Sequence, residues 1–108
     1  MSATERKLLV YGATGFTGRL VVDEARRLGL DPILGGRNRA SLERMAEAVG
    51  APELRVADVT HPTSLAPLMD GVGCVVNCAG PFVRLGEPVL RAAIEAGAHY
   101  LDTTGEQL

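Results

Sequence analysis

Long apolar runs, a strong net charge and paired cysteines are all missing from this 108-residue sequence. No stretch approaches the roughly 18 consecutive apolar residues of a membrane span. The polar N-terminus also lacks the apolar segment of a secretory signal, so we expect a cytoplasmic protein. The formal net charge of −2 gives no general attraction to nucleic acid or to an anionic membrane. Any anion must therefore be bound by a local group of residues.

Cysteine and lysine are scarce. Cys74 and Cys78 lie four positions apart in an apolar run. In a strand their Cα atoms would be roughly 13 Å apart, which is too far for a disulfide, so we expect buried free thiols facing the same side of a sheet. Lys7 is the single lysine, and the other basic residues are arginines. Together with the many alanines and glycines, this indicates a GC-rich coding genome.

Short apolar runs alternate with helical segments along the sequence. The strands are predicted at Leu8–Tyr11, Pro32–Gly35, Leu54–Ala57, Cys74–Cys78 and His99–Asp102. The helices are predicted at Thr17–Leu28, Arg39–Val49, Ser64–Met69 and about Pro88–Gly97. This alternation is typical of right-handed βαβ units. We therefore predict an α/β fold, a Rossmann-type doubly wound parallel sheet of about five strands in the order 3-2-1-4-5.

Apolar spacing also predicts which helix faces are buried. In the first helix the buried residues are expected to be Leu20, Val21, Ala25 and Leu28, and in the second Leu42, Met45, Ala46 and Val49. Proline suits the first turn of a helix, so Gly86-Glu87-Pro88 is expected to begin the fourth one. A carboxylate there would favour the helix dipole.

Three glycines with the spacing G-x-x-G-x-x-G follow the first predicted strand. Gly12 would allow a tight turn, Gly15 would let a pyrophosphate approach the backbone, and Gly18 would let the helix pack against the strand. The helix N-terminus offers unpaired N–H groups to phosphates, and the two threonines add hydroxyls. We expect the whole turn, Gly12-Ala13-Thr14-Gly15-Phe16-Thr17-Gly18, to bind a dinucleotide. The alternative is a purely structural turn.

The residues after the second strand indicate which dinucleotide binds. An NAD site carries an acidic residue here, whereas this sequence has Arg37, Asn38 and Arg39. A guanidinium can bind a 2′-phosphate through two hydrogen bonds, which favours NADP(H) over NAD(H). Alternatively, the two arginines form a solvated surface near a helix start, although a cation is unfavourable beside that end of the dipole.

Two further loops follow the third and fourth predicted strands. Asp58, followed by Val59, could bind an adenine amino group or could cap the next segment. The other loop is Ala79-Gly80-Pro81-Phe82. Its two small residues would allow backbone contact with the cofactor ribose and pyrophosphate, and its proline would restrict the loop. The phenylalanine either walls the nicotinamide side or is structural.

The fifth strand carries two residues that suggest catalysis but are expected to pack. His99 and Tyr100 open this strand, so we expect them toward its amino end, away from the cofactor. Asp102, Thr103 and Glu106 follow and are better placed near an active-site edge.

Together these motifs resemble the N-terminal NADP-binding domain of the saccharopine dehydrogenase-like oxidoreductases, with the bacterial trans-acting enoyl reductases as the most similar branch. The resemblance rests on Tyr11–Arg19, Gly36–Arg39, Asn77–Phe82 with Gly86–Val89, and His99–Glu106. It implies an NADP-dependent oxidoreductase whose cofactor contacts the segments 12–18, 37–39 and 79–82. Its catalytic residues and its small-molecule or lipid-like substrate would belong largely to a downstream domain.

Residues 1–108 are therefore expected to form one domain, truncated after strand five, with no metal site and an exposed edge that could pair in a homodimer. Two alternatives stay open. Extended or atypical short-chain dehydrogenases share the glycine turn, but neither Tyr11 nor Tyr100 is followed by lysine four residues on, as their catalytic pair requires. A non-catalytic module that senses NADP(H) is the second alternative.

Overall fold

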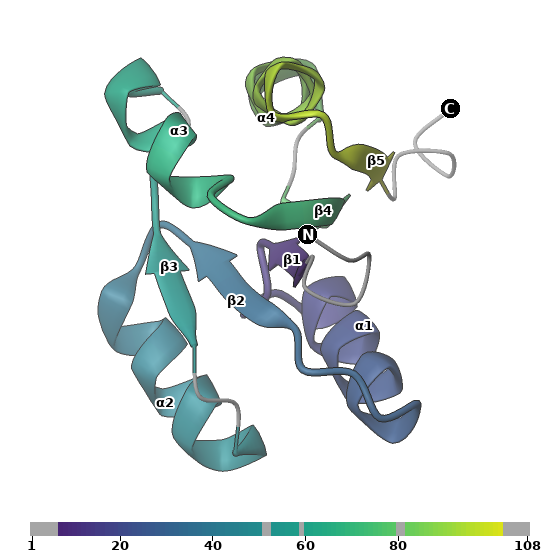
Figure 1. Ribbon diagram of the computed structural model, residues 1–108. Coiled ribbons are helices and arrows are strands. Elements are labelled where there is room, and N and C mark those ends of the chain that lie inside the picture. The colour runs from purple at the N-terminus through teal and green to yellow at the C-terminus, as the bar shows by residue number, and fades with distance from the viewer. Residues whose placement is uncertain (1–6, 51–52, 59, 80–81, 103–108) are drawn as a thin grey trace.

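A computed structural model describes residues 7–50, 53–58, 60–79 and 82–102, with the backbone alone at 62 and 82–87. The strands are β1 (Lys7–Tyr11), β2 (Ile33–Gly36), β3 (Leu54–Val56), β4 (Val72–Asn77) and β5 (His99–Asp102). The helices are α1 (Phe16–Arg27), α2 (Arg39–Val49), α3 (Leu65–Leu68) and α4 (Phe82–Ala96), and a 3₁₀ turn spans Pro62–Ser64. Neighbouring strands pair in parallel in the order β3-β2-β1-β4-β5 (Figure 1), which confirms the predicted fold.

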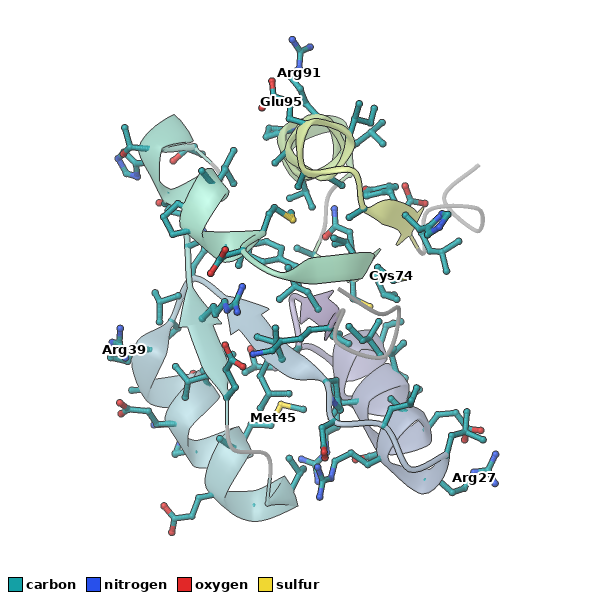
Figure 2. The ribbon with its side chains drawn as sticks, in the orientation of Figure 1. Arg27, Arg39, Met45, Cys74, Arg91 and Glu95 are labelled. Atoms are coloured by element: carbon teal, nitrogen blue, oxygen red, sulfur yellow. The ribbon has the colours of Figure 1, made fainter. Side chains whose placement is uncertain are left out.

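Helices cover both faces of the sheet, α1 and α2 on one and α3 and α4 on the other (Figure 1). The central strand β1 contributes to both cores, because successive side chains of a strand point to opposite faces. Leu9 and Tyr11 pack on the side of α3 and α4, whereas Val10 packs on the side of α1 and α2. Figure 2 shows Met45 reaching inward from α2, where it is buried as predicted.

The predicted face of α1 is wrong at two positions. Leu20 and Leu28 are 53% and 61% exposed, and Val22 is buried instead. The reason is the close approach of Gly18 to the glycine turn, where a Cβ atom would lie 2.1 Å from the carbonyl oxygen of Gly12. This contact turns Gly18 toward the sheet, so the residues four and seven positions later are buried.

The predicted start of α4 is also wrong. The helix begins at Phe82, six residues before the expected position, and Pro88 lies inside it. An internal proline removes one backbone hydrogen bond and typically costs about 3 kcal/mol. The helix nevertheless continues through it, because Val89, Ala92 and Ala93 are buried against the sheet beyond the proline. Tertiary packing therefore outweighs the local preference.

Both cysteines are free, as predicted, but they are partly buried rather than buried. Cys74 lies in β4, and Cys78 lies one residue beyond it, packed against the core under α1 and α2. Burial raises the pKa of both thiols, which keeps them protonated near neutral pH. Among the helices of the described residues, none is long and apolar enough to cross a membrane.

Candidate functional site

The candidate site lies at the carboxyl ends of the strands. The parallel register aligns the end of β1 with the ends of its neighbours, because Tyr11 pairs with Gly35 on one side and with Asn77 on the other. The segments that follow the four strands β1 to β4 therefore meet at one edge of the sheet. These are the segments singled out from the sequence, and this edge is where ligands bind in open α/β sheets.

The three glycines of the turn have different surroundings. Gly12 has a φ of +82°, and a Cβ there would lie 2.6 Å from the backbone nitrogen of Ala79. Gly18 is more crowded still, because its Cβ would lie 2.1 Å from the carbonyl oxygen of Gly12. Gly15 has an ordinary φ of −76°, and its Cβ would meet only the Gly12 oxygen, at 3.6 Å. The outer glycines are therefore required by packing, whereas the middle one leaves open space beside the backbone.

The N-terminus of α1 lies directly against that open space. Gly15 is the N-cap, it supplies no side-chain cap, and the first turn holds no acidic residue. The next helix differs, since the Asn38 side chain accepts a hydrogen bond of 3.0 Å from the backbone nitrogen of Ser41. Helix N-terminal N–H groups need an acceptor, and an anion is the acceptor that also suits the dipole. The residues present thus fit a bound phosphate group.

The side chains of the turn are arranged for contact with a ligand or solvent rather than with the core. Thr14 and Thr17 are exposed, and Phe16 is 83% exposed. Ala13 is the exception, because it is fully buried in the core under α1 and α2. Its backbone nitrogen donates to the Gly35 carbonyl, which ties the turn to the end of β2.

The three residues of the basic segment after β2 have different positions and contacts in the fold. Arg37 is exposed at the end of the strand and close enough to Asp58 to help lower the pKa of that carboxyl. Asn38 caps α2, which gives it a structural task. Arg39 opens α2 and points away from the sheet (Figure 2), with its guanidinium 4.0 Å from the carboxylate of Glu43. Of the three residues, Arg37 is the one placed at the edge of the site.

Asp58 adopts the capping arrangement that was one of its two predicted roles. Its carboxylate accepts hydrogen bonds of 2.6 Å from the Thr60 hydroxyl and 2.9 Å from the Thr60 backbone nitrogen. These bonds hold its pKa below the usual range, the nearby charges of His61 and Arg37 lower it further, and burial opposes the shift. The adenine-binding role remains a prediction.

Several predicted positions cannot be placed. Val59, Gly80, Pro81, Thr103 and Glu106 lie outside the described residues. Phe82 begins α4, but its side chain is outside the description. Among the described residues, no cluster of three or more candidate ligands could hold a metal ion.

A hollow of about 550 Å³ opens beside the glycine turn, between α1 and α2. Thr14, Gly15 and Phe16 line it from the turn, and Ser41 and Arg44 line it from α2. Arg44 was not singled out from the sequence. Helical spacing could have identified it, because Arg44 lies within the first two turns of α2 and on the side of that helix that faces α1.

Tyr100 was expected to face away from the site, but its hydroxyl reaches the carboxyl end of β4. The Asn77 side-chain nitrogen donates to this hydroxyl at 3.1 Å. The backbone of Tyr100 lies toward the amino end of β5, as predicted, but the phenol is long enough to bring the hydroxyl to Asn77. Burial raises the pKa of Tyr100, and the hydrogen bond and charge of Asp102 add to the effect, while the bond from Asn77 lowers it. His99 is exposed on β5.

Comparison with known proteins identifies the family of this chain. The sequence profile of the saccharopine dehydrogenase NADP binding domain matches residues 8–107. A human protein named saccharopine dehydrogenase-like oxidoreductase is 37% identical over 96% of this chain and 29% of its own length. A Mycobacterium tuberculosis protein named as a trans-acting enoyl reductase is 34% identical over 100% of this chain and 28% of its own length.

A solved structure of a Citrobacter sp. triphenylmethane reductase complexed with NADP(H) has a TM-score of 0.77 at 27% identity, over 90% of this chain and 37% of that one. The chain spans less than a third of the length of the human and mycobacterial relatives. With the family profile matching nearly every residue, the chain belongs to the saccharopine dehydrogenase NADP-binding domain family, and its cofactor is NADP(H).

Proposed function

We propose that residues 1–108 form one domain that holds NADP(H) for hydride transfer to or from a small-molecule or lipid-like substrate bound mainly by another part of a longer oxidoreductase. The short coverage of the relatives supports this division of labour, as do their names. When bound, the nicotinamide supplies or accepts the hydride, and this chain binds and orients it. The observation that carries the proposal is the open side of Gly15 at the uncapped N-terminus of α1.

The pyrophosphate is assigned to the turn from Gly12 to Gly18. The absence of a Cβ at Gly15 allows an anion to approach the backbone N–H groups of Phe16 and Thr17 at the helix start. The exposed hydroxyls of Thr14 and Thr17 can donate to the same oxygens. Gly18 holds α1 against the strand, which keeps these donors in place.

The 2′-phosphate is assigned to the side of β2 and β3. Arg37 is the main ligand in this proposal, supported by Arg39 and by the N-terminal end of α2 beside Asn38. Arg44, on the wall of the neighbouring hollow, adds a positive charge that attracts the same group. Asp58 and Val59 are proposed to contact the adenine.

The other half of the cofactor is assigned to the loop after β4. In the sheet, β4 lies on the opposite side of β1 from β2 and β3. A dinucleotide with its 2′-phosphate near Arg37 therefore directs its nicotinamide toward β4 and β5. We assign Ala79, Gly80, Pro81 and Phe82 to contacts with the ribose and the nicotinamide side.

We further propose that the protein is bacterial, that it lies in the cytoplasm, and that it forms a homodimer paired along the β5 edge. The arginine-rich composition indicates a GC-rich genome, which favours a bacterial source. The edge is favoured because β5 has β4 as its only neighbour among the described strands. Light scattering of the purified chain tests the dimer, and cell fractionation tests the location.

The test of the cofactor site is calorimetric titration with NADPH and NADH. Arg37→Asp is expected to weaken NADPH binding about a hundredfold or more, because two charge-assisted hydrogen bonds are lost and repulsion is added. NADH, which lacks the 2′-phosphate, should change far less.

The matched control is Arg91→Asp, which makes the same charge change on the outer side of α4 (Figure 2). It should leave both affinities unchanged. Equal NADPH binding by the wild type and Arg37→Asp would rule out this assignment. Turnover of NADPH by the longer protein would separate the oxidoreductase from a sensor that binds without reacting.

A further inference from the structure

Asn77 is unusual among the described residues because it is a polar side chain that is almost completely buried, at 2% exposure. Burial of an amide is unfavourable unless its donors and acceptor are bonded. Its oxygen accepts a hydrogen bond of 3.0 Å from the backbone nitrogen of Ala79, and its nitrogen donates to the Tyr100 hydroxyl. Asn77 thus joins the loop after β4 to the neighbouring strand.

Tyr100 holds the nitrogen end of this amide. Its hydroxyl accepts the hydrogen bond from the Asn77 nitrogen. The Ala79 backbone N–H can only donate, so it requires the amide oxygen, and the nitrogen is left for the hydroxyl. The hydroxyl therefore anchors one end of a side chain whose other end holds Ala79.

The loop that Asn77 holds also contacts the glycine turn. The Cys78 nitrogen donates to the Tyr11 carbonyl at 2.8 Å, and the Ala79 backbone lies so close to Gly12 that a Cβ there would be 2.6 Å from its nitrogen. The position of Ala79 is thus set by β1 on one side and by the Asn77 amide on the other. A change in that amide would move the loop relative to the turn.

We propose that Tyr100 is a positioning residue of the cofactor site, which acts through Asn77 to hold the Ala79 backbone where the nicotinamide half of NADP(H) contacts it. This inference rests on the cofactor site proposed above. In this proposal the adenosine half of the cofactor, on the side of β2 and β3, binds independently of Tyr100. The two halves of the cofactor therefore respond differently to the same substitution.

The test compares NADPH with adenosine 2′,5′-bisphosphate, which has the adenosine half alone. Tyr100→Phe keeps the ring and removes the hydroxyl, so the Asn77 nitrogen loses its acceptor. We expect NADPH affinity to fall about three- to tenfold, the range of one hydrogen bond, and bisphosphate affinity to change less than twofold. The amide of Ala79 should also exchange its hydrogen faster in nuclear magnetic resonance spectra.

His99→Ala is the matched control, because it alters the exposed neighbour on β5 without touching these hydrogen bonds. It should leave both affinities and the Ala79 exchange rate unchanged. Unchanged NADPH binding in Tyr100→Phe, or equal weakening of both ligands, would overturn the role of Tyr100 alone. A wild-type chain that binds neither ligand would overturn the proposed site and this inference together.

Discussion

Replacing the glycines of the turn one at a time separates cofactor binding from folding. Gly15→Ala places a methyl group in the open space where the pyrophosphate is proposed to lie. Gly18→Ala places the same group 2.1 Å from the Gly12 carbonyl oxygen. The two variants make an identical chemical change three residues apart, and the structure predicts opposite results for them.

The expected stability changes follow from the backbone geometry. At Gly15 the φ of −76° suits any residue, so alanine gains about 0.4–1 kcal/mol by restricting the unfolded chain. Alanine is a poorer N-cap than glycine by an amount of similar size, and the two effects nearly cancel. At Gly18 the helix must move away from the turn by most of an ångström. We expect a loss at or above the upper end of the usual overpacking range of about 1–3 kcal/mol.

Urea denaturation and calorimetric titration with NADPH measure the two effects. Gly15→Ala should unfold at a urea concentration close to that of the wild type and bind NADPH at least tenfold more weakly. Gly15→Val, with a larger side chain, should abolish binding of both NADPH and NADH while the domain stays folded. Wild-type affinity in a folded Gly15→Val variant would refute the reasoning and leave the turn a purely structural feature.

Two further predictions concern residues around the site. In Asp58→Asn the unfolding free energy should decrease less steeply than in the wild type as the pH falls below about 4. The reason is that the folded state lowers the pKa of the Asp58 carboxyl, so this group stabilises the fold above its unfolded pKa and loses that contribution as the pH falls through its folded pKa. Urea midpoints that shift equally in both proteins between pH 7 and pH 3 would contradict this. Tyr11→Phe should lower the unfolding free energy by about 0.5–1.5 kcal/mol, because the buried hydroxyl donates to the Ala57 carbonyl at 2.6 Å and this hydrogen bond is lost. An unchanged urea midpoint would count against it.

The fold was predictable because its signals are local. Short apolar runs separated by amphipathic segments identify buried parallel strands, and the handedness of their connections restricts the strand order. The location of Arg37 followed in the same way, since the residue after a strand lies at the carboxyl edge of the sheet. The position of Arg37 at this edge was thus predictable from the sequence, and its contact with the cofactor stays a prediction.

The features that differ from the predictions depend on contacts between distant segments. The rotation of α1 is set by the crowding of Gly18 against Gly12, which no hydrophobic pattern contains. The start of α4 depends on packing beyond Pro88. The reach of Tyr100 to Asn77 joins residues 23 positions apart on neighbouring strands. Each of these errors comes from applying a local preference where a tertiary contact decides the outcome.

The pairing of β1 with β4 also has a consequence for folding during synthesis. Tyr11 and Asn77 are paired neighbours in the sheet although they lie 66 positions apart in the sequence. While α4 is still being translated, the apolar face that carries Leu9 and Ile33 lacks the part of its cover that the buried residues of α4 provide. A cofactor bound at the proposed site would contact both halves of the chain, and at a hundred times its Kd it would stabilise the completed sheet by about 2.7 kcal/mol.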